Sequence, residues 1–207
     1  MTQKHDDRSQ NDHIREPRAA FGPDPNQGHY TIDDYYALPD ERRVELIDGW
    51  IYDMAAPSMV HQLILGELHL QLAPCVEKHP GCHIFFAPFD VRLDNDDYTM
   101  VQPDLAIICR DGLTRKRMNG APDFIIEILS PSSRAHDMFR KLNKYQAAGV
   151  REYWIVDPDK QKIIVYDLEH EEPPVTYGFH EKIPLLISNG SCTVDFARIS
   201  EKLESLE

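Results

Sequence analysis

The sequence predicts an α+β fold in which helices pack against a mixed β-sheet. Two segments, 59–78 and 133–148, repeat apolar residues at the spacing of an amphipathic helix. Several shorter segments are rich in Val, Ile and aromatic residues and are bounded by turn residues, which is typical of strands. At 207 residues the chain can bury one sizeable core, and two full domains would be a tight fit. We therefore expect a single domain over residues 29–207.

The chain is expected to begin with a flexible tail over residues 1–28. This segment is polar, mixes both charge signs, contains three prolines and has no apolar run typical of a signal peptide. Thr31 then has the side chain of an N-cap, and Pro39 follows the segment that it would open. The first predicted element is therefore a short helix at about 32–38.

A hairpin and a long helix are expected next. Residues 43–54 predict two strands that turn at Asp48-Gly49, a strong signal for a tight hairpin turn. Ser58 is the expected N-cap of the helix at 59–78, in which Ile64, Leu68 and further apolar residues share one face.

The remaining elements complete the mixed sheet. Strands are predicted at about 84–93, 102–109, 123–130, 152–157 and 162–167. The second long helix, 133–148, ends at Gly149, and a short exposed helix is expected after Ser200. The order is a helix, then mostly strands, with two long helices packed on the sheet.

Composition excludes several classes of protein. The net charge of −13 argues against a protein that coats nucleic acid without specificity. No stretch approaches about 18 consecutive apolar residues, so we expect no membrane span. The four cysteines show no Cys-x-x-Cys spacing and no secretory context, which favours reduced thiols in the cytoplasm.

A zinc site is the disfavoured alternative for two of these cysteines. Cys75, His79, Cys82 and His83 are zinc-binding residue types, but their spacing is unusual for such a site. We expect buried cysteines and surface histidines here instead.

Two carboxylates interrupt apolar strands and are the main candidates for a functional site. Asp104 lies in Gln-Pro-Asp-Leu-Ala-Ile-Ile, and Glu127 lies in Asp-Phe-Ile-Ile-Glu-Ile-Leu-Ser. Burying a charged carboxylate is costly unless a cation or strong donors compensate it. If the two strands pair through the loop between them, both carboxylates face one surface of the sheet. Mg²⁺ prefers one or two carboxylates with water and phosphate oxygens, so we expect an oxygen-ligated divalent metal.

Basic residues gather near these carboxylates. The segment from Arg110 to Lys144 holds eight basic and four acidic side chains, a net charge of +4. A locally positive rim would suit a phosphate-bearing substrate, and ordinary solvated surface charges explain it equally well. Within this segment we select Arg140 and Lys144 as candidate substrate-binding residues. Gln102, beside the first carboxylate, could bind a phosphate or a water.

Lys141 is a third candidate for the site. It lies at the border of the apolar stripe of helix 133–148, so its stem can be buried while its ammonium reaches the sheet. There it could stabilise charge that develops on a phosphate. The alternative, which the spacing alone favours, is an exposed pair with Asp137 one turn earlier.

Several spaced motifs resemble the Uma-two family of restriction endonucleases, a branch of the PD-(D/E)XK nuclease-like superfamily. The resemblance covers roughly Tyr30 to Ser188 and implies a restriction-endonuclease-like mixed sheet flanked by helices. The motifs that carry it are Glu45-Leu-Ile-Asp-Gly, Ser58 to His61, Pro103-Asp104, Glu127-Ile-Leu-Ser-Pro-Ser, Asp137, Lys141, Tyr145, Gly149-Val150, Glu152-Tyr-Trp and Asp157-Pro158.

The resemblance implies a role for each matching residue. Asp104 and Glu127 would be metal ligands, while Glu45 and His61 would be placed near the metal. The lysine that the wider superfamily carries two residues after the second acid is Leu129 here. In this branch the lysine lies on the following helix, where Lys141 matches it.

The implied activity is hydrolysis of phosphodiester bonds in DNA with Mg²⁺ or Mn²⁺. The metal would activate water and offset charge, Lys141 would stabilise the transition state, and Glu45 would complete the metal shell or act as a base. The alternative is a catalytically inactive nuclease-like domain that binds nucleic acid or a protein. A homodimer is expected because cutting both strands of a duplex is simplest with two sites.

Overall fold

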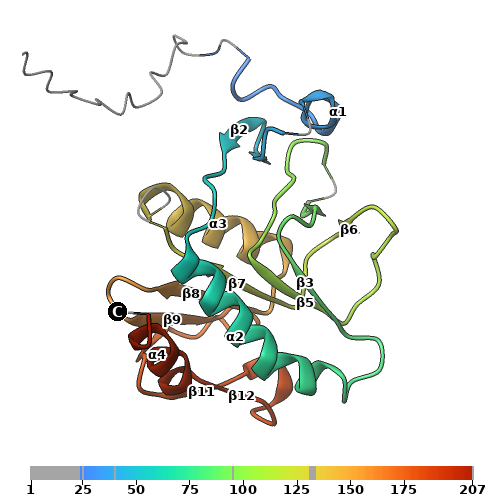
Figure 1. Ribbon diagram of the computed structural model, residues 1–207. Coiled ribbons are helices and arrows are strands. Elements are labelled where there is room, and N and C mark those ends of the chain that lie inside the picture. Colours follow the sequence, from blue (N-terminus) through green and yellow to red (C-terminus); the bar gives the residue numbers. More distant parts are fainter. Residues whose placement is uncertain (1–23, 25, 40, 95, 131–133, 207) are drawn as a thin grey trace, which may run out of the picture.

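The computed structural model of the protein describes residues 24, 26–39, 41–94, 96–130 and 134–206, and the side chains of 134–139 lie outside the description. A six-stranded mixed sheet forms its centre (Figure 1). β7 and β8 pair in parallel and the other neighbours pair antiparallel, which confirms the predicted fold class. In spatial order the strands are β10 (Val175–Gly178), β9 (Lys162–Asp167), β8 (Glu152–Asp157), β7 (Phe124–Ile128), β5 (Leu105–Ile108) and β3 (His83–Phe86).

Helices cover both faces of this sheet. α2 (Met59–Val76) and α4 (Phe196–Glu204) lie on one face, and α3 (Arg134–Ala148) lies on the other (Figure 1). The alternation of side chains along β7 sets the two layers, because Phe124 and Ile126 pack in the core beneath α2 while Ile125 packs beneath α3.

The hairpin and α1 lie together at one end of the sheet. β1 (Val44–Ile47) and β2 (Trp50–Asp53) turn at Asp48 and Gly49, which adopt positive φ angles of 52° and 76°. Thr31 caps α1 (Ile32–Ala37) as predicted, in a capping box with Asp34. The end of the expected tail is ordered against the hairpin, since the Gly28 amide donates to the Gly49 carbonyl at 2.8 Å. Residues 1–23 of that tail lie outside the described residues.

The predicted strand at 84–93 is two strands in the structure. β3 ends at Phe86, and β4 (Val91–Arg92) pairs in parallel with β6 (Met118–Asn119). Pro88 has no amide hydrogen to donate to a ladder, so it favours an exit from the sheet between the two strands. β6, only two residues long, was not predicted.

The last part of the chain forms a small layer that the sequence did not predict in full. β11 (Lys182–Pro184) pairs with β12 (Thr193–Asp195) around a 3₁₀ turn at Leu186–Ser188. The helix expected after Ser200 is present and largely exposed over residues 201–204, but it is the end of a longer helix, α4, which begins at Phe196 and buries Phe196 and Ile199. Among the described residues, no helix is both long and apolar enough to cross a membrane.

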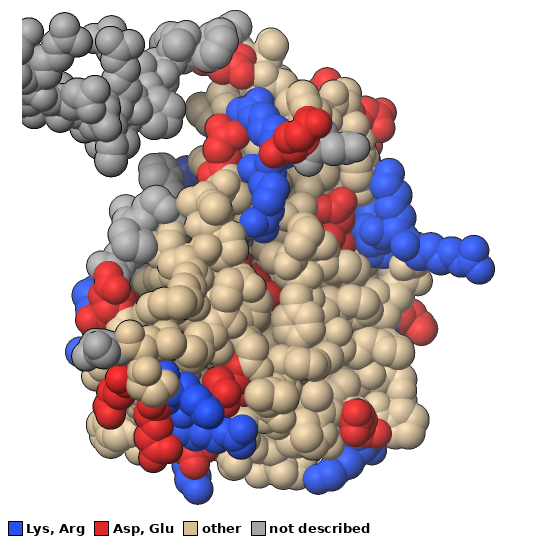
Figure 2. Space-filling model, in the orientation of Figure 1, with Lys and Arg blue, Asp and Glu red and all other residues tan. Residues whose placement is uncertain are grey.

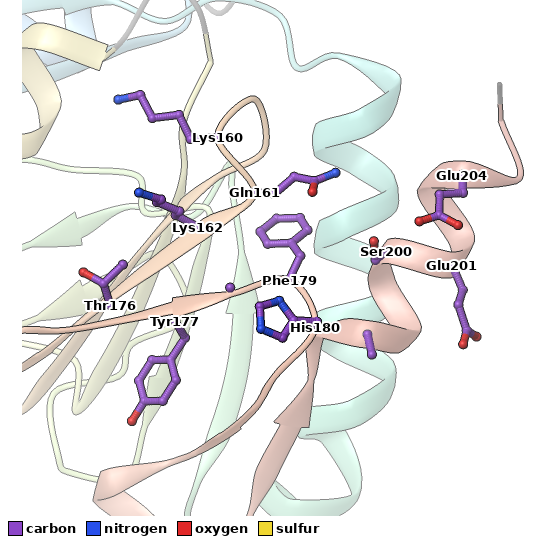
Figure 3. Close-up of a pocket in the computed structure, with 12 residues that line it drawn as sticks. Lys160, Gln161, Lys162, Thr176, Tyr177, Phe179, His180, Ser200, Glu201 and Glu204 are labelled. Carbon is purple, nitrogen blue, oxygen red and sulfur yellow. The ribbon is translucent and has the colours of Figure 1, made fainter.

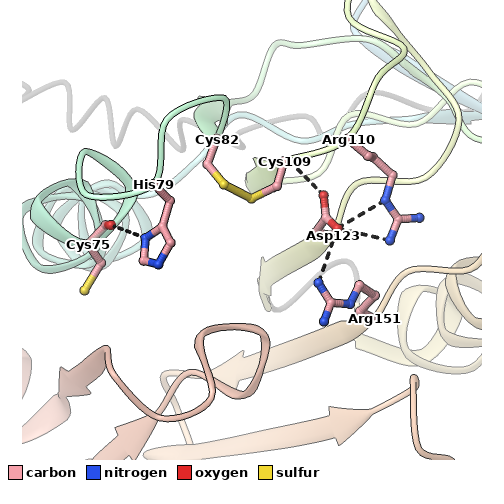
Figure 4. The surroundings of a disulfide bond; sticks show 7 residues. All are labelled: Cys75, His79, Cys82, Cys109, Arg110, Asp123 and Arg151. Atoms are coloured by element: carbon pink, nitrogen blue, oxygen red, sulfur yellow. Dashed lines mark hydrogen bonds and ion pairs between the residues drawn. A yellow bond between two sulfur atoms is a disulfide. The ribbon is translucent and has the colours of Figure 1, made fainter.

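All four cysteines form disulfides, which corrects the expectation of reduced thiols. Cys75 at the end of α2 pairs with Cys192. Cys82 pairs with Cys109, which directly follows β5 (Figure 4). The bonds join residues 117 and 27 positions apart, so spacing along the chain could not show them. His79 contacts the Cys75 carbonyl through its ring, at 2.9 Å. Because both cysteines of the disfavoured zinc alternative are bonded elsewhere, that alternative is excluded here.

Candidate active site

A cleft of about 380 Å³ opens where β5 begins and β7 ends. The connection from β2 to α2, residues 54–57, forms one wall, and the first turn of α2 and the middle of α3 contribute to the others. Four of the predicted site residues line it: His61, Asp104, Glu127 and Lys141. They come from α2, from the residue directly before β5, from β7 and from α3.

Pairing between β5 and β7 brings the two carboxylates together. Leu105 pairs with Ile126 in the antiparallel ladder, so the preceding Asp104 faces the following Glu127 on the same side of the sheet. The Ile128 amide donates to Asp104 Oδ2 at 2.7 Å, and His61 Nε2 lies 3.0 Å from the same oxygen. Ser58 caps α2 by accepting from the His61 amide, and this contact orients the first turn toward the carboxylate.

Lys141 lies buried between two glutamates. Its Nζ is 3.0 Å from Glu127 Oε1 and 2.8 Å from Glu45 Oε2. Only 4% of the lysine side chain is exposed, so the pairing compensates charges that are removed from water. The expected alternative of an exposed lysine is therefore wrong, and the side chain of Asp137, its expected partner, lies outside the described residues.

Tyr145 completes the surroundings of Glu127. Its hydroxyl donates to Glu127 Oε1 at 2.7 Å, one helical turn beyond Lys141. Burial raises the pKa of Glu127 to about 8; Lys141 opposes this rise, while the negative charges of Asp104 and Glu45 add to it. Burial also raises the pKa of Tyr145, so its hydroxyl keeps its proton as a donor. No role was predicted for Tyr145, although its i+4 spacing from Lys141 places the two side chains on one face of α3.

Glu45 contacts the site through Lys141 and does not line the cleft itself. One carboxylate oxygen accepts from the Gln102 amide at 2.8 Å, and the other binds Lys141. Both oxygens are therefore engaged in holding the protein together, and this arrangement orients the ammonium of Lys141. Glu45 comes from β1, so the hairpin contributes to the site through this residue.

The three predicted substrate-binding residues, Gln102, Lys144 and Arg140, do not line the cleft. The Gln102 side chain is buried and donates to Tyr35 and to Asp90 rather than lining the cleft. Lys144 pairs with Asp48 and Asp94 and also does not line it. Arg140 lies with its guanidinium carbon 4.6 Å from the ring centre of Tyr52, a residue of the cleft wall.

The carboxylates fit a hard divalent cation with incomplete protein ligation. Within the described part of the chain, the bonds of Asp104 all use Oδ2 and those of Glu127 all use Oε1. The second oxygen of each carboxylate is thus a candidate ligand in the cleft. No group of three or more His, Cys, Asp or Glu side chains in the described ranges is arranged to hold a metal. Two carboxylates with water and phosphate oxygens is the arrangement that Mg²⁺ prefers.

A second and larger cavity lies away from these residues. It measures about 590 Å³ between the β9–β10 hairpin and α4 (Figure 3). Basic and acidic side chains line it together, among them Lys160, Lys162, Glu201 and Glu204. The basic side chains on the face in Figure 2 are likewise scattered among acidic ones rather than gathered over one surface. The convergence of carboxylates and a buried lysine therefore distinguishes the smaller cleft.

Comparisons with known proteins found a matching family and a similar solved structure. The Uma2 family, described as "Putative restriction endonuclease", matches residues 32–191. Among solved structures, a nuclease described as putative and as belonging to DUF820, from Anabaena variabilis ATCC 29413, superposes with a TM-score of 0.68. It is 21% identical, and the match covers 82% of this chain and 96% of that one. No curated protein matches the sequence.

Proposed function

The chain belongs to the Uma2 ("Putative restriction endonuclease") family, and on this basis we propose that it is a metal-dependent endonuclease that hydrolyses phosphodiester bonds in DNA. The observation that carries the proposal is the convergence of Asp104, Glu127 and Lys141 on one cleft. A buried lysine between carboxylates supplies positive charge, and the carboxylates supply oxygen ligands, at a single place. Phosphodiester hydrolysis requires both.

Asp104 and Glu127 would hold Mg²⁺ or Mn²⁺ through their second oxygens. When bound, the metal would lower the pKa of a water and offset negative charge on the phosphate. The Ile128 amide and His61 fix Asp104, while Tyr145 fixes Glu127, so both ligands are preorganised. His61 is thus a positioning residue in this proposal.

Lys141 would stabilise the negative charge that develops on the phosphate during in-line displacement. Glu45 and Glu127 hold its ammonium at the wall of the cleft, in surroundings from which water is largely excluded. Glu45 would act through this lysine, because both of its oxygens are already bonded within the protein. Glu45 was predicted to act as a base or a metal ligand. We propose instead that it positions Lys141.

The second candidate function is a nuclease-like domain that binds nucleic acid or a protein without cutting it. It is favoured by the short distances from Lys141 to both glutamates, because such pairs stabilise a fold without any catalysis. The lack of a third convergent metal ligand among the described residues also favours it.

A cleavage assay distinguishes the two candidates. The parent, Asp104→Asn and Glu127→Gln are incubated with supercoiled DNA, single-stranded DNA and RNA, in Mg²⁺, Mn²⁺ or a chelator. Asp111→Asn is the matched control, since this exposed carboxylate lies outside the cleft. We expect nicking of DNA by the parent and the control only, and only with metal. Equal cleavage by all variants would show that the site is wrong, and binding without cleavage would favour the second candidate.

Metal binding is tested separately by thermal unfolding. A cation that binds only the folded state raises the unfolding temperature, and we expect Mg²⁺ or Mn²⁺ to do so for the parent. The shift should be lost in Asp104→Asn and retained in Asp111→Asn. An equal shift in Asp104→Asn would contradict ligation by this carboxylate.

We also propose a homodimer and a cytoplasmic location. β10 is an edge strand with Val175 half exposed, so it offers a surface for pairing with a second copy. Light scattering after gel filtration would give the mass directly, and a monomer at the concentrations of the cleavage assay would contradict the dimer. The proposed location is supported by the proposed DNA substrate alone. The cysteines give it no support, because all four form disulfides in the structure.

A further inference from the structure

Arg43 lines the cleft and has a guanidinium nitrogen without a hydrogen-bond partner among the described residues. The two carboxylates line the same cleft, and this nitrogen is the buried Nε. The neighbouring Arg42 instead pairs with Asp53, at 2.8 Å. In a chain with 35 acidic and 22 basic side chains, a cleft arginine that pairs with no carboxylate in the described part of the chain needs an explanation.

The hairpin directs Arg43 and Arg42 to opposite sides. Residues two apart in a strand share a face, so Arg43 lies on the face of Glu45, whose carboxylate reaches Lys141. The Met54 amide donates to the Arg43 carbonyl at 2.9 Å and extends the β1–β2 ladder to this residue. Arg42 lies on the face of Val44, which is paired with Asp53 in the ladder. Position along the strand thus places Arg43 on the face of Glu45, beside the cleft, and Arg42 on the opposite face.

A second guanidinium with an unpaired donor lies beside the same hairpin face. Arg140 stacks over Tyr52, and its Nη1 is buried without a hydrogen-bond partner in the described ranges. Tyr52 is paired with Glu45 across the hairpin and lines the cleft. Two arginines with unsatisfied donors therefore adjoin the surface that leads to Asp104 and Glu127.

An arginine that lines a cleft without an anionic partner among the described residues can donate hydrogen bonds to an anionic ligand there. The guanidinium fork matches the oxygens of a phosphate, and arginine is the side chain best suited to bind one. We propose that Arg43 is a substrate-binding residue that holds a backbone phosphate of a polynucleotide next to the scissile phosphate. This inference rests on the proposed nuclease function and adds a residue that the sequence analysis did not select.

Binding measured without cleavage tests this role. Fluorescence anisotropy with a labelled oligonucleotide, single-stranded or duplex, is measured in a chelator at several salt concentrations. The variants are Arg43→Ala, Arg43→Gln and Arg43→Lys, with Arg42→Ala as the matched control of equal charge change. We expect Arg43→Ala and Arg43→Gln to bind roughly tenfold more weakly, with a shallower salt dependence. Arg43→Lys should recover part of the affinity, and Arg42→Ala should stay within about twofold of the parent.

The outcomes separate this inference from the proposed function. Parent-like affinity in Arg43→Ala and Arg43→Gln would overturn the role of Arg43, even if the parent cleaves DNA. An equal loss in Arg42→Ala would show a general charge effect and would also overturn it. A selective loss at Arg43 in a protein that binds but never cleaves would support the role of Arg43 and reject the nuclease. If the parent binds no oligonucleotide, both fail. Thermal unfolding of each variant confirms that it is folded.

Discussion

Lys141 lies between Glu45 and Glu127, with all three side chains buried. Replacing it by methionine, which has a similar length and no charge, would leave two carboxylates buried without their cation. We expect Lys141→Met to lower the free energy of unfolding by about 3–5 kcal/mol at neutral pH. Urea unfolding of the variant and the parent measures the difference.

The matched comparison is Lys144→Met, three residues along the same helix. Lys144 pairs with Asp48 and Asp94 at a more exposed position, so its replacement should cost about 1 kcal/mol or less. Equal losses in the two variants would show that burial of the Lys141 pairs does not set their contribution.

Glu152 provides a pH-dependent test of a different buried carboxylate. It accepts from Trp154 Nε1 at 2.6 Å and from the Ile187 amide at 2.9 Å, and burial raises its pKa from 4.5 to about 7. Because the folded state binds this proton more tightly, the contribution of Glu152 to stability is greatest below pH 4.5 and is lost as the pH rises to 7. At about 1.4 kcal/mol for each tenfold change in proton affinity, the loss totals roughly 3 kcal/mol.

Urea unfolding of the parent and Glu152→Gln from pH 4 to pH 8 measures this loss. The parent should lose stability relative to the variant across that range, whatever the absolute stability of the variant. A constant difference between the two proteins would mean that Glu152 titrates alike in the folded and unfolded chain.

The principal site residues could be predicted because their surroundings are unusual in the sequence. Asp104 and Glu127 stand in apolar strands, and burial of such carboxylates requires compensation. Arg43 could not be selected in this way, because an arginine at a hairpin is ordinary until its missing partner is seen. Gln102 was selected for its position beside Asp104, but its side chain points to Tyr35 and Asp90.

At the scale of elements, the hairpin turn connects two parts of the fold. Gly49 has a φ of +76°, and a Cβ there would lie 2.7 Å from the Gly28 carbonyl group. Gly49→Ala therefore combines an unfavourable backbone conformation with a clash against backbone. We expect a loss of about 2–4 kcal/mol in the free energy of unfolding.

Gly81→Ala isolates the backbone part of this effect. Gly81 has a φ of +94°, yet a Cβ there would meet no atom within 4 Å. Its replacement should cost about 1 kcal/mol. If thermal or urea unfolding gave the same loss for both variants, the contact between Gly49 and Gly28 would not be important.

Elements with strong local signals were predicted, and those that depend on distant contacts were not. The Asp48-Gly49 hairpin and the helix capped by Ser58 follow from residues adjacent in the chain. β6 has two residues and exists because β4 lies beside it, so no local pattern marks it. The exposed end of α4 after Ser200 was predicted, but its start was not, because Phe196 and Ile199 are buried in a core formed with distant residues such as Leu68.

At the scale of the whole molecule, the two disulfides constrain the unfolded chain to different extents. Closing a loop across 117 residues removes more entropy than closing one across 27. In the chain-entropy treatment the contributions are about 5 kcal/mol for Cys75–Cys192 and about 3.5 kcal/mol for Cys82–Cys109. Variants in which either pair is changed to alanine should show losses in this order in urea unfolding without reductant.

Treatment of the parent with a reductant should lower its stability by at least the larger of these amounts. Each double-alanine variant should then lose further stability on reduction, since it retains one disulfide. A variant that is unaffected by reductant would show that its remaining bond does not form in solution.

The contacts of α2 have a consequence for synthesis of the protein on the ribosome. The helix is translated early, but Gln71 bonds Asp195 and Leu68 and Leu72 pack in the core that also holds Val194 and Phe196. At a translation rate of about 5–20 residues per second, these partners are synthesised roughly 6–25 seconds after the helix. During that interval its apolar face is exposed on the nascent chain, where chaperones have an opportunity to bind it.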